Sequence, residues 1–192
     1  MENESREIYS EYLIPQEMKF IPEKMNALLH IEGPTQIEER VISAAANLKM
    51  EQKGDFHLTV IGSKNGRSLL ESVKTDSGIE KFIKEQFESQ IWEYRLLPEY
   101  YHLQKFYDRA ALNKSGYGEE VSEHNRYTII QMAELPDLDS FYKEINKRTQ
   151  LNLPTPLPHI TLFSGADYQP LASRGIGVDS KEDFDKYQPK SI

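Results

Sequence analysis

The sequence repeats one short pattern at two places that lie far apart in the chain. Residues 57–60 read His-Leu-Thr-Val, and residues 159–162 read His-Ile-Thr-Leu. Aliphatic and β-branched residues that alternate with polar ones predict β-strands over 56–62 and 158–164. Side chains two apart in a strand point the same way, about 6.6 Å from each other, so each histidine shares a face with its threonine. One face of each strand therefore buries aliphatic residues, and the other carries an imidazole and a hydroxyl.

The repeat extends beyond these two strands. Each half has a strand, a helix and a His-x-Thr strand, at 26–32, 35–49 and 56–62 in the first half and at 126–135, 138–150 and 158–164 in the second. Two such β-α-β halves, related by a pseudo-twofold axis, would bring the two histidines face to face. The sequence thus predicts an α+β fold with two lobes, built of antiparallel sheets, around a central cleft.

The segments between the repeats give weaker signals. Residues 63–75 are expected to be a connection, and a capping box at Ser77 begins a helix with Ile79, Phe82, Ile83, Phe87 and Ile91 on its buried face. Strands are expected at 92–97 and 100–107, separated by Pro98. Residues 109–124 are expected to form a mobile loop that closes over the cleft, because loops of that length are uncommon unless functional.

The ends of the chain are expected to extend a single domain that spans residues 1–192. Residues 1–24 would be an N-terminal extension with an edge strand near Leu13, and residues 166–192 a C-terminal tail. Within the tail, Ser180 has the position of an N-cap for a short helix. The Gly175-Ile176-Gly177 segment lacks the third glycine of a dinucleotide fingerprint, so we attribute it to the path of the tail.

Composition excludes several classes of protein. The chain has no cysteine, so it has no disulfide, thiolate zinc site or cysteine nucleophile. Its net charge of −8 disfavours broad binding to long nucleic acid. The N-terminus is polar, and no apolar run approaches the roughly 18 residues that would span a membrane. We therefore expect a soluble, cytoplasmic protein with no membrane contact, and its oligomeric state is left open.

Two imidazoles that face one cleft suit acid–base catalysis. Their ordinary pKa near 6.5 lets one be neutral and accept a proton while the other is charged and donates one. The hydroxyls of Thr59 and Thr161 can donate hydrogen bonds to phosphate oxygens. Metal binding by His57 and His159 is disfavoured, because no His-x-His, His-Glu-x-x-His or aspartate cluster supplies further ligands. The sequence thus predicts phosphodiester cleavage without a metal or other cofactor.

A pair of His-x-Thr-hydrophobic motifs in duplicated β-α-β halves resembles the 2H phosphoesterase superfamily, over roughly residues 25–165. This superfamily includes 2′-5′ RNA ligase-like proteins and phosphodiesterases that act on 2′,3′-cyclic phosphates or cyclic oligonucleotides. The resemblance implies that His57 and His159 are catalytic and that Thr59 and Thr161 bind phosphate. It also implies a substrate that is a nucleotide, a cyclic oligonucleotide or a short RNA end.

Four further residues are candidates for substrate binding. Lys64 and Arg67 follow the first motif, and Tyr168 and Arg174 follow the second. The cations could meet phosphate and the tyrosine could stack on a base, as could Tyr127. The alternative for each cation is ordinary solvated charge, and for each tyrosine a place in the core or an interface. The single histidines His30, His102 and His124 are interpreted as structural or surface residues.

Two other functions remain open from the sequence. The chain could be a non-catalytic module that binds a nucleotide, although such a binder would not need a second acid–base group. It could also process or ligate RNA ends as 2′-5′ ligase-like proteins do, for which the acidic balance of the chain is unfavourable.

Overall fold

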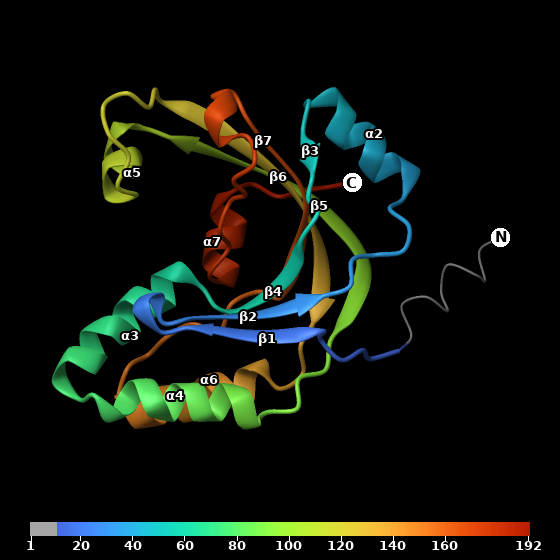
Figure 1. Cartoon of the computed structure of the whole chain (residues 1–192). Coiled ribbons are helices and arrows are strands. Elements are labelled where there is room, and N and C mark those ends of the chain that lie inside the picture. The colour runs from blue at the N-terminus through green and yellow to red at the C-terminus, as the bar shows by residue number, and fades with distance from the viewer. Residues whose placement is uncertain (1–10) are drawn as a thin grey trace.

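The computed structural model describes residues 11–192, which form two antiparallel sheets and six α-helices (Figure 1). The three-stranded sheet has the order β1 (Glu17–Ile21), β2 (Asn26–Ile31) and β4 (Phe56–Ile61). The five-stranded sheet has the order β3 (Glu51–Gln52), β7 (His159–Ala166), β6 (His124–Glu134), β5 (Arg95–Tyr107) and β8 (Lys190–Ser191). The predicted α+β class with antiparallel sheets is confirmed.

The helices fill the connections between these strands. They are α2 (Glu39–Asn47), α3 (Ser63–Thr75), α4 (Gly78–Ser89), α5 (Arg109–Lys114), α6 (Leu138–Thr149) and α7 (Lys181–Lys186), with short 3-10 turns η1 (Pro22–Lys24) and η2 (Gln169–Leu171). The predicted helices over 35–49, 77–91 and 138–150 correspond to α2, α4 and α6. The predicted cap of the tail helix is confirmed, because Ser180 Oγ accepts a hydrogen bond from the backbone N–H of Asp183.

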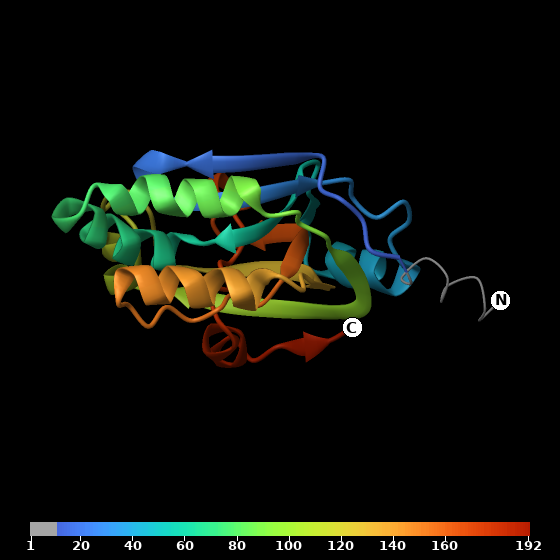
Figure 2. The ribbon, with the colours of Figure 1, turned by 90° about the horizontal axis from the view of Figure 1, so that it is seen from below.

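Helices α4 and α6 lie side by side against the three-stranded sheet (Figure 2). The rings of Phe87 in α4 and Phe141 in α6 are 6.5 Å apart, and Phe87 also approaches Phe20 of β1. The buried hydroxyl of Tyr142, in α6, donates a hydrogen bond of 2.9 Å to the carbonyl of Val60 in β4. Although α6 connects β6 to β7, it therefore packs on the other sheet.

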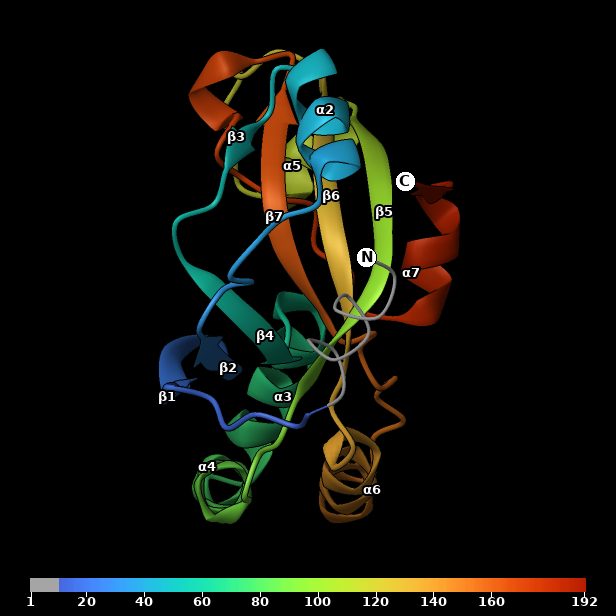
Figure 3. The ribbon, with the colours of Figure 1, turned by 90° about the vertical axis from the view of Figure 1, so that its right-hand side faces the viewer.

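Helices α2 and α7 pack on opposite faces of the five-stranded sheet, and Figure 3 shows α2 in front of the strands and α7 beside β5. Arg40 of α2 lies over the ring of Tyr100, and Phe184 of α7 meets the ring of Tyr101 edge-on. Tyr100 and Tyr101 are neighbours in β5, so their side chains point to opposite faces. Helix α2 follows β2 of the three-stranded sheet and leads to β3, an edge strand of the five-stranded sheet. It packs on the five-stranded sheet, although β2 and β4 belong to the other one.

The two His-x-Thr strands bury the faces that the sequence predicts. Leu58 and Val60 in β4 and Ile160 and Leu162 in β7 are all fully buried, and they belong to one core cluster that contains residues of both sheets. The histidines and threonines between them are half-buried. The apolar sides of the two strands thus hold the core together and leave the polar sides for a site.

Strand β4 carries a β-bulge directly after its threonine. Thr59 is paired with Leu28 of β2, whereas Ile61 is paired with Ala27, so Val60 is an extra residue in β4. A bulge of this kind bends its strand and turns the neighbouring side chains. The carbonyl of Val60, the extra residue, accepts the hydrogen bond that the Tyr142 hydroxyl donates.

Strand β7 carries the same irregularity at the matching position. Thr161 is paired with Ile130 of β6 and Phe163 with Ile129, so Leu162 is the extra residue. The Leu162 carbonyl accepts a hydrogen bond of 2.8 Å from the backbone N–H of Lys53. Each motif thus has a bulge at the residue after its threonine. In both, the carbonyl of the extra residue accepts a hydrogen bond from a group that belongs to neither of the two paired strands.

The expected connection at 63–75 is wrong, because these residues form helix α3. Gly66 weakens the helical signal of the sequence, since glycine is a poor helix former. A Cβ atom at this position would lie 2.4 Å from the carbonyl oxygen of Lys24. Gly66 is thus the residue that lets α3 approach the η1 turn closely.

The two expected strands at 92–97 and 100–107 are one strand, β5. Its pairing with β6 is interrupted between Leu96 and Tyr100, and Pro98 lies in that interruption. Proline has no backbone N–H, and none is needed there because the ladder is not formed. Ile91, expected on the buried face of α4, is instead 75% exposed beyond the end of that helix.

The expected loop at 109–124 is partly wrong, and both ends of the chain hold more structure than expected. Helix α5 is capped by Asp108, which accepts from the backbone N–H of Ala111, and it buries Leu112. In the N-terminal segment, 17–21 forms β1, and Leu13 makes only an isolated bridge with Tyr94. The part of the N-terminal extension before residue 11 lies outside the described residues.

No helix within residues 11–192 is both long enough and apolar enough to cross a membrane.

The contact between α6 and the β4 bulge gives a stability prediction. Tyr142→Phe removes the hydroxyl that donates to Val60 and accepts from Asn65 Nδ2. We expect it to lower the free energy of unfolding by about 1–3 kcal/mol, because buried polar partners are left unpaired. Tyr127→Phe, whose hydroxyl contacts only exposed Asp167, should change that free energy by no more than about 0.5 kcal/mol. Equal losses in urea unfolding would contradict this role of Tyr142.

Candidate active site

A cleft of about 340 Å³ opens between the three-stranded sheet, strand β7 and the C-terminal segment. It is lined by Asn26, Leu28, Lys53, Asp55, His57, Thr59, Gly62, Ser63, His159, Thr161, Gly175, Ile176, Gly177, Val178 and Asp179. The four motif residues His57, Thr59, His159 and Thr161 are all in this set. Residues from two distant parts of the sequence therefore meet in one cleft, and they come from strands that contact each other.

The ring of His159 is held in one orientation. Its Nδ1 atom lies 2.7 Å from the carbonyl oxygen of Leu157. A carbonyl oxygen only accepts, so Nδ1 carries the hydrogen and, in the neutral ring, Nε2 is the basic atom. Burial lowers the pKa of His159 below its usual value, the hydrogen bond to Leu157 opposes this, and the nearby His57 lowers the pKa further. The neutral imidazole, able to accept a proton at Nε2, is therefore favoured at His159.

His57 has a different set of neighbours. Burial lowers its pKa, whereas Asp55 favours the charged ring, and His30 and Lys53 oppose it. His30 is the residue paired with His57 across β2 and β4, and the two ring centroids are 6.0 Å apart. The Nδ1 atom of His57 is buried without a hydrogen-bond partner among the described residues. Burial thus leaves the pKa of His57 below its usual value, and Asp55 is the neighbour that opposes this.

Asp55 and His30 form a pair beside this ring. His30 Nδ1 lies 3.2 Å from Asp55 Oδ1, and the second ring nitrogen of His30 is buried without a partner. Asp55 is mostly exposed, so solvent screens its effect. Interpreted from the sequence as structural, His30 in fact lies against a predicted catalytic residue.

The N-terminus of α3 forms another wall of the cleft. Asp179 is close enough to the backbone N–H of Lys64 to accept a hydrogen bond, and it lies against Gly62. A Cβ atom at position 62 would clash with Asp179 Oδ1, so a larger residue there would force this carboxylate to move. Burial raises the pKa of Asp179, and Asp183 raises it further. The C-terminal segment is thus attached to the end of β4 at the cleft.

Lys53 attaches the same segment on the other side. Its Nζ atom donates a hydrogen bond of 2.8 Å to the carbonyl of Ser173, just before Gly175. A Cβ atom at Gly175 would lie 3.6 Å from Thr161 Oγ1, in ordinary contact. The segment that the sequence attributes to the path of the tail therefore lies directly over the second threonine.

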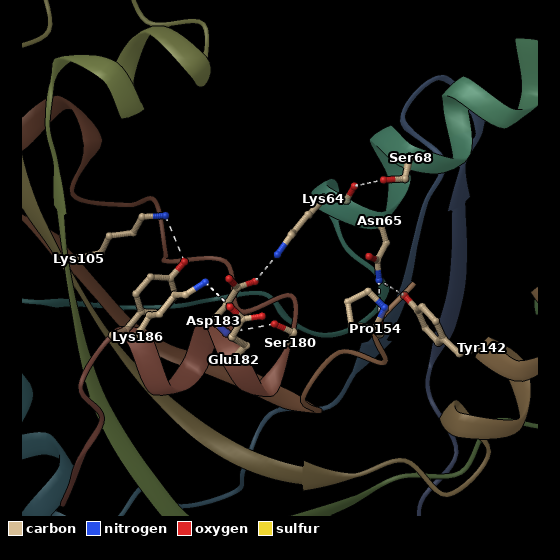
Figure 4. A network of polar contacts seen from close by, with 11 residues as sticks. Lys64, Asn65, Ser68, Lys105, Tyr142, Pro154, Ser180, Glu182, Asp183 and Lys186 are labelled. Carbon is tan, nitrogen blue, oxygen red and sulfur yellow. Dashed lines mark hydrogen bonds and ion pairs between the residues drawn. The ribbon is translucent and has the colours of Figure 1, made fainter. Parts of the chain in front are cut away.

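Lys64 and Arg67, predicted to meet phosphate, both lie in α3. Figure 4 shows Lys64 reaching toward Asp183 of α7, and its Nζ atom is 3.3 Å from Asp183 Oδ2. Arg67 lies close enough to Asp179 to affect its pKa. Among residues 11–192, neither belongs to the set that lines the cleft.

Tyr168 and Arg174, the other two predicted binding residues, also lie outside that lining set. Tyr168 packs against the ring of His124 at 5.7 Å, within a small cluster around Leu112. The guanidinium of Arg174 lies 5.6 Å from the ring centroid of Tyr117. The structure therefore brings together the four motif residues and leaves the other four candidates around them.

The lining residues that sequence reasoning missed are mainly Lys53, Asp55 and residues 175–179. Lys53 and Asp55 lie in a segment for which the sequence, through Gly54 and Asp55, predicts only a turn. A signal for the tail was present in the two glycines Gly175 and Gly177, which permit a backbone to lie close to other groups. Nothing in the local pattern indicates which group they approach.

Within the described part of the chain, no group of three or more histidine, aspartate or glutamate side chains is arranged to hold a metal ion.

Comparisons with models of protein families, with curated proteins and with solved structures found no match to this chain.

The neighbours of His57 give a prediction about its titration. Asp55→Asn removes the negative charge but leaves an oxygen that can accept from His30, so we expect the pKa of His57 to fall. The pKa of His102 serves as the internal control, because neither Asp55 nor His57 is among its causes. Both values can be followed by NMR titration of the ring Cε1 protons. An unchanged or raised pKa of His57 would contradict the assignment.

Proposed function

We propose that this protein is a metal-independent phosphodiesterase that hydrolyses a nucleotide phosphodiester with His57 and His159 as its acid–base pair. The substrate would be a 2′,3′-cyclic phosphate, a cyclic oligonucleotide or a short RNA end, as in the 2H phosphoesterase superfamily that the motifs resemble. One observation carries the proposal: both histidines and both threonines line one cleft. A module that only binds a nucleotide would not need a second histidine and threonine in the same cleft.

The surroundings of the two rings suggest how the roles divide. The Nδ1–H of His159 is held by the Leu157 carbonyl, which leaves Nε2 free to accept a proton. We assign it as the base that takes a proton from water while the water oxygen bonds to phosphorus. We assign His57, which Asp55 favours in its charged form against the larger effect of burial, as the acid that gives its proton to the oxygen that leaves as the P–O bond breaks. The reaction then ends with the two protonation states exchanged.

The two threonines would hold the phosphate between the rings. Thr59 and Thr161 lie two residues after their histidines on the same strand faces, about 6.6 Å along each strand. Each hydroxyl can donate to a non-bridging phosphate oxygen whose charge grows in the transition state. Ser63, at the first position of α3, adds a hydroxyl and a helix N-terminus to the same cleft.

The finer architecture that goes with this function is a pair of pseudo-symmetric lobes. Three matched features support it: strand pairs of the same direction, a bulge one residue after each threonine, and a helix in each half that packs on the other sheet. The match is imperfect, because His30 pairs with His57 where Met132 pairs with His159. Such a difference is expected if one ring acts as the base and the other as the acid.

The test is a screen for turnover of 2′,3′-cyclic mononucleotides, cyclic dinucleotides and short RNAs, with a chelator present throughout. We expect hydrolysis of at least one class, with a bell-shaped pH profile that belongs to the pair of histidines. His57→Ala and His159→Ala should each lower kcat by about 10²–10⁴-fold. The double variant should lose less than the product of the two, because the groups act in one step.

His102→Ala provides the matched control for that experiment, because His102 is a single histidine of β5 outside the cleft lining. Folding of each variant is followed by circular dichroism. Near-full activity of folded His57→Ala and His159→Ala would refute the assignment. Ligand binding without turnover would indicate the nucleotide-binding module instead, and activity that returns only with a divalent ion would refute metal independence.

The threonines give a second, independent prediction. Thr161→Val keeps the shape of the strand but removes one donor to the phosphate, and should cost about 2–4 kcal/mol of transition-state stabilisation. The loss should appear in kcat/KM on the substrate found by the screen. Thr75→Val serves as control, because Thr75 is exposed at the end of α3 and its hydroxyl donates only to Ser72. Equal kcat/KM for the Thr161→Val and Thr75→Val variants would show that Thr161 does not bind the phosphate.

A further inference from the structure

Three cations gather on the inner face of the five-stranded sheet, next to the cleft: Lys105, Arg126 and Arg174. We call them the cation cluster. Lys105 in β5 is paired directly with Arg126 in β6, so two positive side chains stand opposite each other on one face. Like charges in that position destabilise a sheet unless something offsets them. In a chain with a net charge of −8, this local excess of positive charge needs an explanation.

Arg126 is the central residue of the cluster. It is only 5% exposed, and its Nη2 atom is buried without a hydrogen-bond partner in the described residues. Its Nε donates to Nε2 of His124, whose Nδ1 lies 2.7 Å from the Ser122 carbonyl. His124 is therefore a neutral ring, because one nitrogen donates and the other accepts. The charge of Arg126 is not balanced by this contact.

No acidic side chain balances it either. None of the ion pairs among residues 11–192 includes Arg126, Arg174 or Lys105. Lys105 donates instead to the hydroxyl of Tyr187, at 3.2 Å. Buried cations are normally paired, because an unpaired charge in the interior costs several kcal/mol. An unpaired Arg126 is therefore available to an anion.

Aromatic rings position the cluster without neutralising it. The guanidinium of Arg126 lies 4.1 Å from the ring centroid of Tyr107 and 5.4 Å from that of Tyr117. Arg174 lies 5.6 Å from the same Tyr117 ring. A ring face attracts a cation but accepts few of its N–H groups, so Nη2 still lacks an acceptor.

The cluster is continuous with the catalytic cleft. Thr128 lies two residues after Arg126, about 6.6 Å along β6 on the same face. A Cβ atom at Gly175 would be 3.7 Å from Thr128 Oγ1 and 3.6 Å from Thr161 Oγ1, so this glycine lies between the two threonines. Ser164, paired with Thr128, has a buried Oγ without a partner in the described part of the chain. A polar path thus leads from Thr161 to Arg126.

We propose that Arg126 and Arg174, with Lys105, form a second anion site that holds a phosphate of the substrate other than the one that is cleaved. The proposal rests on the function proposed above and names its substrate class more closely: a nucleotide with at least two phosphates, a dinucleotide or longer. A guanidinium fork matches two oxygens of a phosphate, which a planar ring contact does not satisfy.

Tyr117 is the side chain that a bound phosphate would displace. It lies between the two guanidinium groups and comes from residues 115–123, which contain no helix or strand. A side-chain hydrogen bond from Arg109 to the carbonyl of Gly118 fastens this segment to α5. The segment expected to close over the cleft would in this arrangement open and close the second site.

The first test measures the site without any turnover. NMR of the arginine Nε–H groups is followed while inorganic phosphate is added to the His57→Ala/His159→Ala double variant. We expect the signals of Arg126 and Arg174 to move together, and the shift to disappear in Arg174→Gln, which changes an exposed side chain. Signals that stay in place throughout the titration would refute the second site, whether or not the protein is a phosphodiesterase.

The second test compares two substrates of the wild type. One is a 2′,3′-cyclic mononucleotide, and the other is a dinucleotide that carries the same cyclic phosphate and one further phosphodiester. Arg174→Gln and Arg126→Gln should lower kcat/KM on the dinucleotide about 10- to 100-fold more than on the mononucleotide, since each removes charged hydrogen bonds to the second phosphate.

The control is Lys143→Gln, which removes an exposed cation of α6 far from this face and should treat both substrates alike. If Arg126→Gln does not fold, Arg174→Gln decides the result alone. An equal effect on both substrates would refute the second site while the proposed function stands. Hydrolysis of neither substrate would exclude 2′,3′-cyclic phosphates from the proposed function, and the phosphate titration would then decide the anion site.

Discussion

The hydrogen bond from the backbone N–H of Lys53 to the carbonyl of Leu162 determines how the two sheets meet. It continues the pairing of β3 with β7, after which the chain leaves the five-stranded sheet and enters the three-stranded sheet as β4. One continuous segment therefore contributes an edge strand to each sheet. Because β4 and β7 contact each other beyond this point, His57 and His159 reach the same cleft. If the register slipped by one residue, the histidines would point into the core.

The bulges in β4 and β7 adapt both strands to this meeting. A bulge turns the strand after the threonine and leaves one extra residue there, Val60 in β4 and Leu162 in β7. The carbonyl of each extra residue is bonded by a group from the other half: Tyr142 of the second half bonds Val60, and Lys53 of the first bonds Leu162. The polar faces thus stay directed toward the cleft because the bulge carbonyls are satisfied elsewhere.

Strands β2, β4, β6 and β7, helices α2, α4, α6 and α7, and the faces that carry the four motif residues could be predicted from sequence because their signals are local. Period-2 alternation in 56–62 and 158–164 sets which side is buried, and no distant contact changes that result. Helix α3 could not be predicted, because Gly66 serves a close approach to Lys24 that only the folded chain reveals. The same holds for the C-terminal segment: Gly62 and Asp179 fit together across the whole length of the sequence, and neither residue indicates the other.

Eight buried side-chain polar atoms lack partners within the described residues, and three of them, Arg95 Nε, His102 Nε2 and Gln131 Oε1, lie away from the cleft. The other five include Asn26 Oδ1, in the cleft lining. His57 Nδ1, His30 Nε2, Ser164 Oγ and Arg126 Nη2 all lie on the sides of β2, β4, β6 and β7 that face the cleft and the cation cluster. Leaving such groups unpaired destabilises a fold by about 1–3 kcal/mol each, which a structural role would not require. A ligand that brings acceptors and negative charge would remove this cost as it binds. The positive side chains along the path, and not the overall charge of −8, would then determine which molecules the cleft attracts, because an exposed acidic surface is screened within about 10 Å by salt whereas a buried guanidinium is not.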